Sequence, residues 1–151
     1  MTTIIAVAAA PAVGQDQIST LSELRVDVVS KKSFENTIEH LKWRFGEHGL
    51  VINWASNYAH VVNPDDSRKS GAVVFELLQH SWLQKILAND PTAAMAMPIR
   101  LMVIRTPNGE TLVTYYRVSV LMQASDGSGL QALGESVDEK LTRIVRLATS
   151  N

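Results

Sequence analysis

One hairpin in the second half of the chain constrains the fold more than any other feature. Ile99 to Arg105 and Thr111 to Tyr116 are rich in β-branched and aromatic residues, which favour strands. The connection contains Asn108-Gly109, a pair that readily adopts the positive φ angles of a tight turn. The sequence therefore predicts two antiparallel strands that lie side by side.

Three further segments have the composition of strands. Residues 24–29 alternate apolar with charged side chains, which predicts a strand with one buried face. Residues 50–54 form a short second strand. Residues 72–78 are almost continuously apolar, and this pattern predicts a central strand covered on both faces. Residues 83–87 are expected to form a helical turn or a loop.

Two segments have the pattern of amphipathic helices. The first begins at Ser33, whose hydroxyl can accept from a backbone N–H of the first turn, and ends at Gly49. The second is expected to begin at Ser136, because Glu139 three residues later completes a capping box. Apolar residues recur at helical spacing in both: Phe34, Ile38, Leu41 and Phe45 in the first, and Val137, Leu141, Ile144, Val145 and Ala148 in the second.

The length and composition fit one folded domain. A chain of 151 residues, 46% of them apolar, can bury a continuous core without disulfides or a structural metal. We expect this single domain to span residues 23–151. Residues 1–22 form a separate N-terminal extension or the remnant of a signal peptide.

The N-terminal extension is the main indication of location. An apolar run from Ile4 is followed by small residues, with Ala12 and Gly14 spaced as at a signal-peptide cleavage site. This pattern predicts export to the periplasm, although no Lys or Arg precedes the run. Retention of the segment as a first strand would instead indicate a cytoplasmic protein.

Several functional classes lack their sequence signatures. The net charge is −1 and the basic residues are scattered, which argues against nucleic-acid binding. No apolar run approaches the roughly 20 residues that span a bilayer. Cysteine is absent, so thiolate catalysis and cysteine-based metal sites are excluded. The chain also lacks a Gly-x-Ser-x-Gly elbow, a phosphate loop and a dinucleotide fingerprint, which favours a protein that is not an enzyme.

Two of the four histidines lie in irregular or transitional segments beside aromatic residues. His60 follows Tyr58 and His80 precedes Trp82, and we expect a ligand pocket near these four residues. A histidine there could equally be an ordinary surface or boundary residue.

A haem or a transition metal is the alternative ligand. His60 is the candidate metal ligand, because imidazole binds both haem iron and transition metals. A thioether could supply a second ligand, from Met95, Met97, Met102 or Met122. Against this interpretation, the sequence contains no His-x-His or His-Glu-x-x-His spacing, and methionine in β-rich segments usually fills gaps in the core.

Two adjacent tyrosines end the hairpin. Tyr115 and Tyr116 must point to opposite faces of their strand, so one should face the core and the other solvent or a partner. We expect core packing or a dimer contact for this pair.

Three segments resemble the bacterial and archaeal family called domain of unknown function 302. Ser33 to Lys42 with Glu47 to Leu50 is similar to the family's first helix and its exit into a strand. Asn89 to Leu101 resembles its Pro-Ala-Ala-Met-Pro stretch, and Pro107 to Tyr116 resembles its closing hairpin. The resemblance implies an α+β fold, with a mainly antiparallel sheet of about four to five strands and two principal amphipathic helices packed on it. Members of such small-sheet families often dimerise, so we also expect a homodimer.

The family lends no established activity, so the functional hypothesis depends on the residues. The favoured hypothesis is an exported, dimeric small-ligand-binding or accessory domain with its pocket near His60, His80 and Trp82. The alternatives are a haem- or metal-binding protein, perhaps redox-active, that uses His60, and a protein–protein interaction module. The small molecule or partner protein stays unidentified.

Overall fold

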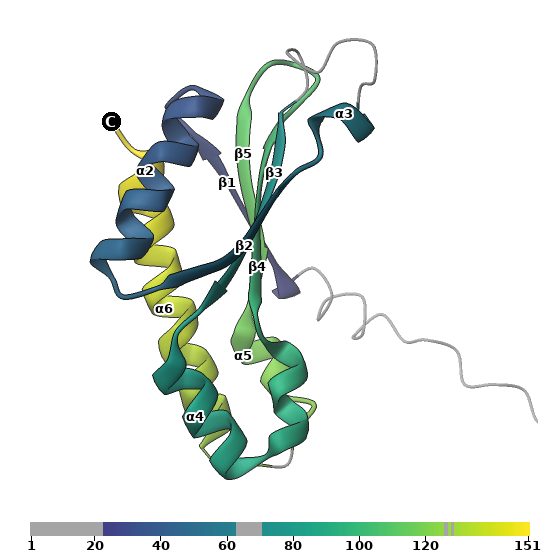
Figure 1. The fold of residues 1–151 in the computed structure, drawn as a ribbon, viewed down its shortest axis with the longest axis vertical. Helices are drawn as coiled ribbons and strands as arrows, with labels where there is room; N and C mark the ends of the chain where they lie inside the picture. The colour runs from purple at the N-terminus through teal and green to yellow at the C-terminus, as the bar shows by residue number, and fades with distance from the viewer. Residues whose placement is uncertain (1–22, 63–70, 126, 128) are drawn as a thin grey trace, which may run out of the picture.

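The computed structural model describes residues 23–62, 71–125, 127 and 129–151, which form a five-stranded sheet with helices (Figure 1). The strand order is β1-β5-β4-β3-β2, and every neighbouring pair is antiparallel. The strands are β1 (Arg25–Ser30), β2 (Val51–Asn57), β3 (Ala72–Leu78), β4 (Ile99–Arg105) and β5 (Thr111–Tyr116). The expected α+β class with a mainly antiparallel sheet is confirmed.

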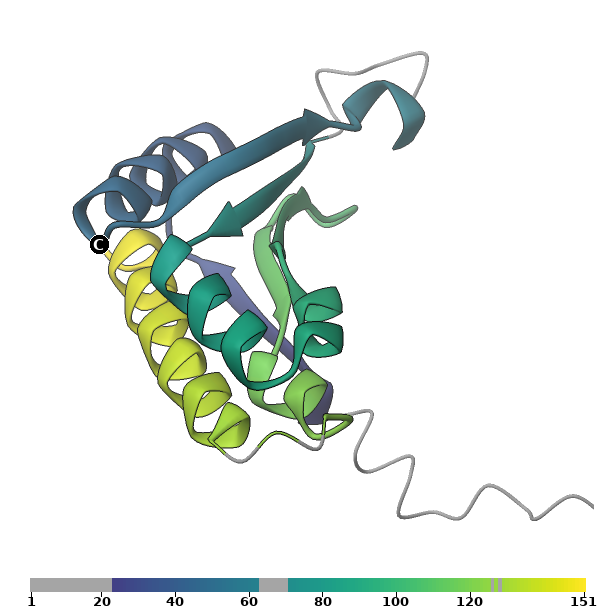
Figure 2. The same cartoon turned by 60° about the horizontal axis from the view of Figure 1, so that its bottom comes forward.

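Three helices make up a layer on one side of the sheet: α2 (Phe34–Glu47), α4 (His80–Asn89) and α6 (Leu130–Thr149). Helices α2 and α6 lie side by side against the strands, and α4 extends this layer beyond the strand ends (Figures 1 and 2). The core lies between these helices and the sheet. Phe45 of α2 meets Phe75 of β3 edge to face, with ring centroids 5.6 Å apart, and both rings are fully buried.

Three shorter elements stand at the ends of the strands: α3 (Ala59–Val62), the 3-10 helix η1 (Pro91–Ala96) and α5 (Val118–Met122). Asp90 begins η1 by accepting a hydrogen bond from the N–H of Thr92 at 2.9 Å. Because η1 leads into β4 and α5 follows β5, the two short helices meet at the same end of the sheet.

The predicted hairpin and first helix are confirmed in detail. Strands β4 and β5 have the expected bounds, and Gly109 in their connection has φ of 88°. Ser33 caps α2 by accepting from the N–H of Asn36 at 3.2 Å, and Gly49 beyond its end has φ of 70°. Local sequence signals sufficed for both elements.

Three expectations about elements were wrong. Helix α6 begins at Leu130, not at Ser136, so the expected capping box lies inside the helix. Leu130 and Gly134 are both buried, and their burial against neighbouring elements extends the helix by more than a turn. The segment around residues 83–87 forms a helix of 10 residues, α4. Strand β3 packs under the helices on one face, and Val74, Glu76 and Leu78 on its other face are only half-buried.

Candidate functional site

Among the described residues, no helical layer covers one face of the sheet, which we call the open face. Alternate residues of the strands point to opposite faces, so Leu101, Val103 and Val113 are buried under the helices. Met102 points the other way, and the strand register places it between Val74 of β3 and Thr114 of β5. The open face therefore has an apolar centre.

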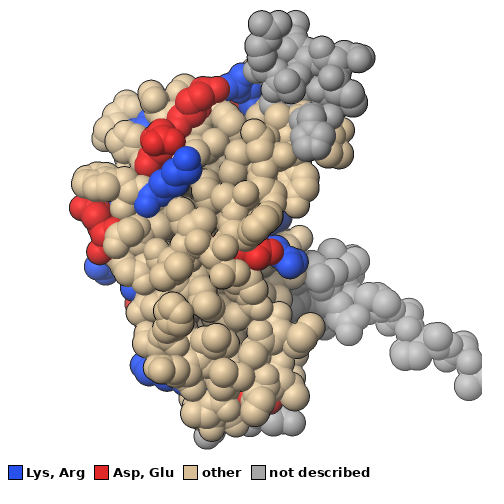
Figure 3. All heavy atoms as spheres, viewed as in Figure 1, with Lys and Arg blue, Asp and Glu red and all other residues tan. Residues whose placement is uncertain are grey.

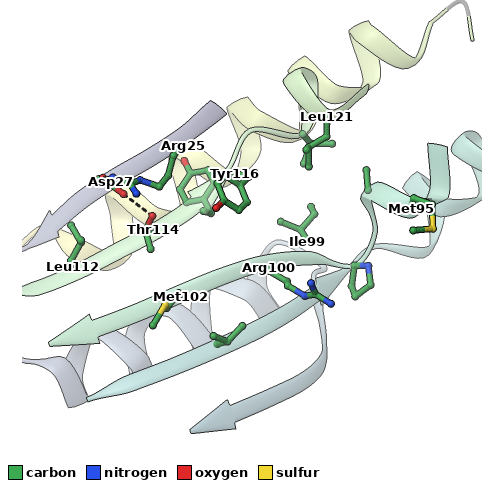
Figure 4. A pocket seen from close by; sticks show the side chains of 15 residues that line it. Arg25, Asp27, Met95, Ile99, Arg100, Met102, Leu112, Thr114, Tyr116 and Leu121 are labelled. Atoms are coloured by element: carbon green, nitrogen blue, oxygen red, sulfur yellow. Dashed lines mark hydrogen bonds and ion pairs between the residues drawn. The ribbon is translucent and has the colours of Figure 1, made fainter. Parts of the chain in front are cut away.

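A hollow of about 690 Å³ lies on the open face, and we call it the hollow (Figure 4). Val74, Met102 and Leu112 from the strands contribute apolar surface to it. At the end of the sheet where η1 and α5 meet, Met95 and Leu121 form its margin. Such a mixture of strand and helix side chains makes a concave, mainly apolar surface.

The side chains at the margin of the hollow are unusually exposed for their type. Met95 on η1 is 91% exposed and Tyr116 at the end of β5 is 52% exposed. Leu121 on α5 is 38% exposed. These large apolar side chains gather around the hollow and stay open to solvent.

The position of α5 is fixed by a buried carboxylate of α6. Asp138, 8% exposed, accepts hydrogen bonds from the N–H of Val118 at 2.6 Å and from the N–H of Ser119 at 3.3 Å. Its second oxygen also accepts from the Ser119 hydroxyl. These are first-turn N–H groups that a helix leaves without internal partners. Asp138 thereby holds the element that carries Leu121.

The polar groups of the hollow are two arginines, one aspartate and a few hydroxyls. Arg25 pairs with Asp27 at 2.9 Å, and Asp27 also accepts from the Thr114 hydroxyl at 2.6 Å. Arg100 lies on the other side of the hollow, and its Nε is 3.3 Å from a carboxylate oxygen of Glu76. The Arg100 side chain is 71% exposed. Among the described lining residues, positive charge exceeds negative charge by one, because Glu76 is not part of the lining.

The arrangement is suited to binding. Its methionines are flexible and adapt to ligands of different shape, and Tyr116 offers an aromatic ring. Arg100 can donate to an acidic group at the rim. Figure 3 shows no continuous patch of acidic or basic side chains on the face seen there, and residues of both signs lie near one another.

The structure places two of the predicted pocket residues, Tyr58 and His80, far apart. Tyr58 lies just beyond β2 and donates its N–H to the carbonyl of Ala72, the first residue of β3, at 2.7 Å. His80 begins α4 beyond the other end of β3, so the length of a seven-residue strand, about 20 Å, separates the two. Neither of them lines the hollow.

The structure places Trp82 in the core, whereas it does not describe the side chain of His60. Trp82 is 6% exposed and belongs to the core, and the Lys140 ammonium lies 5.2 Å from the centre of its ring. Burial lowers the pKa of Lys140. His60 falls within α3, and its side chain lies outside the described part of the structure. The described residues contain no group of three or more His, Asp or Glu side chains arranged to hold a metal ion.

The two tyrosines alternate as predicted. Tyr115 is 3% exposed, and its hydroxyl lies 3.3 Å from that of Thr142 on α6. Tyr116 faces the hollow. Of this pair, only Tyr116 has appreciable surface to offer to a ligand or a partner.

Sequence reasoning missed the hollow, although one signal was present. In a strand with one solvated face, apolar residues alternate with polar ones. In β4, Met102 and Ile104 break this rule on the face opposite Leu101 and Val103, and Leu112 breaks it in β5. Apolar residues on both faces of the hairpin are therefore the signal that the sequence offered for the hollow. No sequence signal indicates that η1 and α5 contribute to the hollow, because only the folded chain brings them together.

None of the helices that the structure describes combines the length and the hydropathy needed to cross a membrane.

Comparison with known proteins identifies a family and a fold. The model of a family described as domain of unknown function DUF302 matches residues 26–148. The chain is also similar to a crystal structure of an uncharacterised conserved DUF302 protein from Bacillus stearothermophilus, with a TM-score of 0.73 and 16% identity. That match covers 83% of this chain and 98% of the other. No curated protein sequence matched.

Proposed function

Since this chain belongs to the DUF302 family, whose description names no activity, we propose a function from its own geometry: it binds a small apolar molecule with one acidic group in the hollow. The observation that carries this proposal is an apolar hollow of about 690 Å³ on the open face of the sheet. Pockets of about 300–1,000 Å³ with mainly apolar walls and a few polar groups are typical of small-ligand sites.

The residues that line the hollow indicate which class of ligand it would bind. Met102 and Leu112 favour an apolar body, and Tyr116 favours an aromatic or planar one. Arg100 at the rim favours a carboxylate or sulfonate. Arg25 donates to Asp27 through both Nε and an Nη nitrogen, whereas Arg100 contacts Glu76 through Nε alone, so we assign the acidic group to Arg100.

Two related fluorescent probes test this assignment. The sulfonate 8-anilinonaphthalene-1-sulfonate and the neutral N-phenyl-1-naphthylamine share an apolar body, and only the first carries an acid. The folded protein should bind both. Met102→Glu should lower the affinity for both probes at least about tenfold, because a charge then lies on the apolar floor of the hollow. Arg100→Gln should lower the affinity for the sulfonate about five- to tenfold and the affinity for the neutral probe less than about twofold.

A matched control uses an apolar residue away from the hollow. Leu147 on α6 is 42% exposed and does not line the hollow, so Leu147→Glu should leave both affinities unchanged. Near-ultraviolet circular dichroism should accompany the titrations, because partly folded states also bind such probes. Unchanged binding by Met102→Glu would place the probe elsewhere and reject the proposal.

A protein–protein interaction module is the second candidate, and one observation favours it. Trp54 on β2 is 63% exposed, and its register partner Glu76 pairs with Arg100, so Trp54 belongs to the open face as well. The exposed apolar surface thus extends past the hollow. Trp54→Ser separates the two candidates, because it should leave probe binding intact and weaken only a larger partner.

Haem or metal binding through His60 stays a prediction. An absorbance spectrum and elemental analysis of protein purified without an affinity tag provide its test. A Soret band or bound metal that disappears in His60→Ala would support it, and a colourless, metal-free protein that cannot be reconstituted would reject it.

Export is likewise a proposal, and residues 1–22 on which it depends lie outside the described structure. Mass measurement of the native N-terminus decides between cleavage near Gln15 and an intact end.

A further inference from the structure

None of the described strands pairs with the outer edge of β1. Among the described strands, β1 pairs only with β5. The N–H of Arg117 donates to the carbonyl of Leu24 at 2.7 Å, so the even-numbered residues of β1 direct their backbone groups toward β5. Arg25, Asp27 and Val29 consequently direct their N–H and C=O groups outward, where a further strand could receive them.

The two edges of the sheet differ in regularity. The pairing of β2 with β3 shifts register between Ile52 and Trp54, as at a β-bulge, and such irregularities hinder edge-to-edge pairing. The register of β1 is regular over all six of its residues. Strand β1 is therefore the edge that can accept another strand.

The charges on β1 select both the partner and the register. Arg25 and Asp27 are exposed and lie on the same face of the strand, two positions apart. A second β1 strand in antiparallel orientation can place Asp27 opposite Asp27 or opposite Arg25. The first register sets like charges against each other, and the second makes two attractive pairs through two-fold symmetry.

We propose that two copies of this chain pair along β1 in antiparallel orientation, with Arg25 of each copy opposite Asp27 of the other. The two sheets then form one continuous sheet of ten strands. In this register Val26 lies on the two-fold axis and faces Val26 of the second copy. Arg25 and Asp27 also line the hollow, so the hollows of the two copies become neighbours on one surface.

Apolar surface beside β1 supports this pairing. Val26 and Val28 are half-buried, and together with Tyr115 they line a groove of about 310 Å³ between β1 and α6. The second strand would cover the solvent-facing side of both valines. The inference does not rest on the ligand proposed for the hollow, because the outward backbone groups of β1 and the charges of Arg25 and Asp27 carry it whether or not the hollow binds a molecule.

Single cysteines test the register directly, because the chain has no cysteine of its own. Val26→Cys should form an intermolecular disulfide under mild oxidation, since opposite residues of a non-hydrogen-bonded pair have Cα atoms about 4.5 Å apart. Val28→Cys is the matched control on the same face. In the proposed register Val28 faces Leu24, so its cross-linked yield should be at least about tenfold lower. Equal yields, or none at position 26, would overturn the proposal.

Light scattering with charge variants tests the pairing without a cross-link. The unmodified chain should have the mass of a dimer at micromolar concentration. Arg25→Glu should raise the dissociation constant at least about tenfold, because two attractive pairs become repulsive. The double variant Arg25→Asp with Asp27→Arg restores opposite charges across the axis and should recover the dimer.

Glu39→Lys on the exposed face of α2 is the control and should remain dimeric. Circular dichroism should confirm that each variant is folded. A monomeric unmodified chain, or a double variant as weak as Arg25→Glu, would contradict the proposal.

Discussion

At the scale of single residues, Asp138 shows how a buried charge serves the architecture. Asp138 lies within α6, and its carboxylate accepts hydrogen bonds from the first two N–H groups of α5. A carboxylate near the first turn of a helix also interacts favourably with the helix dipole. Asp138 therefore needs no catalytic role to explain its burial.

Replacing Asp138 tests this structural role. Asp138→Ala should lower the free energy of unfolding by about 2 kcal/mol, because two N–H groups lose their acceptor. Asp138→Asn keeps one side-chain oxygen and should cost less. Urea unfolding gives both values, and Glu139→Ala at an exposed neighbouring position is the control. Equal stability of Asp138→Ala and the unmodified chain would contradict the assignment.

Tyr115 gives a prediction about alkaline pH. Burial raises the pKa of its hydroxyl, while the hydrogen bond with Thr142 acts in the opposite direction. The unfolded chain then releases this proton at lower pH than the folded chain, so the stability from this group is lost as pH rises above about 10. Tyr115→Phe has no such proton to lose.

Urea midpoints measured from pH 8 to alkaline pH test this expectation. The midpoint of the unmodified chain should fall more steeply than that of Tyr115→Phe. Tyr116→Phe, which removes an exposed hydroxyl, is the control and should follow the unmodified chain. Parallel curves for Tyr115→Phe and the unmodified chain would reject burial of the hydroxyl.

At the scale of elements, helices α5 and α6 approach each other closely at a glycine. A Cβ atom at Gly134 would lie 2.6 Å from the Cα atom of Ser119. Gly46 in α2 has no atom within 4 Å of the same position. Gly134→Ala should therefore destabilise the protein by about 1–3 kcal/mol, whereas Gly46→Ala should stabilise it by up to about 1 kcal/mol.

Thermal unfolding of the two glycine variants checks both signs. A stabilised Gly134→Ala would mean that α5 and α6 are farther apart than the structure places them.

The sequence predicted elements well where their signals are local. Asn108-Gly109 specifies its turn, and Ser33 specifies the start of α2. The start of α6 could not be found in this way, because Ser136 and Glu139 match a capping box that tertiary contacts override. Leu130 and Gly134 are helical because they pack against other elements, and that information is not local.

At the scale of the whole molecule, the described helices form a layer on one side of the sheet, and the apolar hairpin also contributes side chains to the open face on the other side. The family resemblance predicted the fold because it spans nearly the whole folded chain. The candidate site was predicted at Tyr58, His60, His80 and Trp82, where irregular sequence and aromatic residues suggested a pocket. The hollow draws on six elements, β1, β3, η1, β4, β5 and α5, and only their arrangement in space makes it visible.

The methionines allow the most direct test of the hollow as a ligand site. The described residues include four, of which Met95 and Met102 line the hollow, while Met97 and the buried Met122 do not. With carbon-13 in the methionine methyl groups, 8-anilinonaphthalene-1-sulfonate should shift the Met95 and Met102 signals through the ring currents of the probe. The Met122 signal should stay in place. Shifts of Met122 as large as those of Met102, or no shift of Met95 and Met102 at saturating probe, would contradict the account.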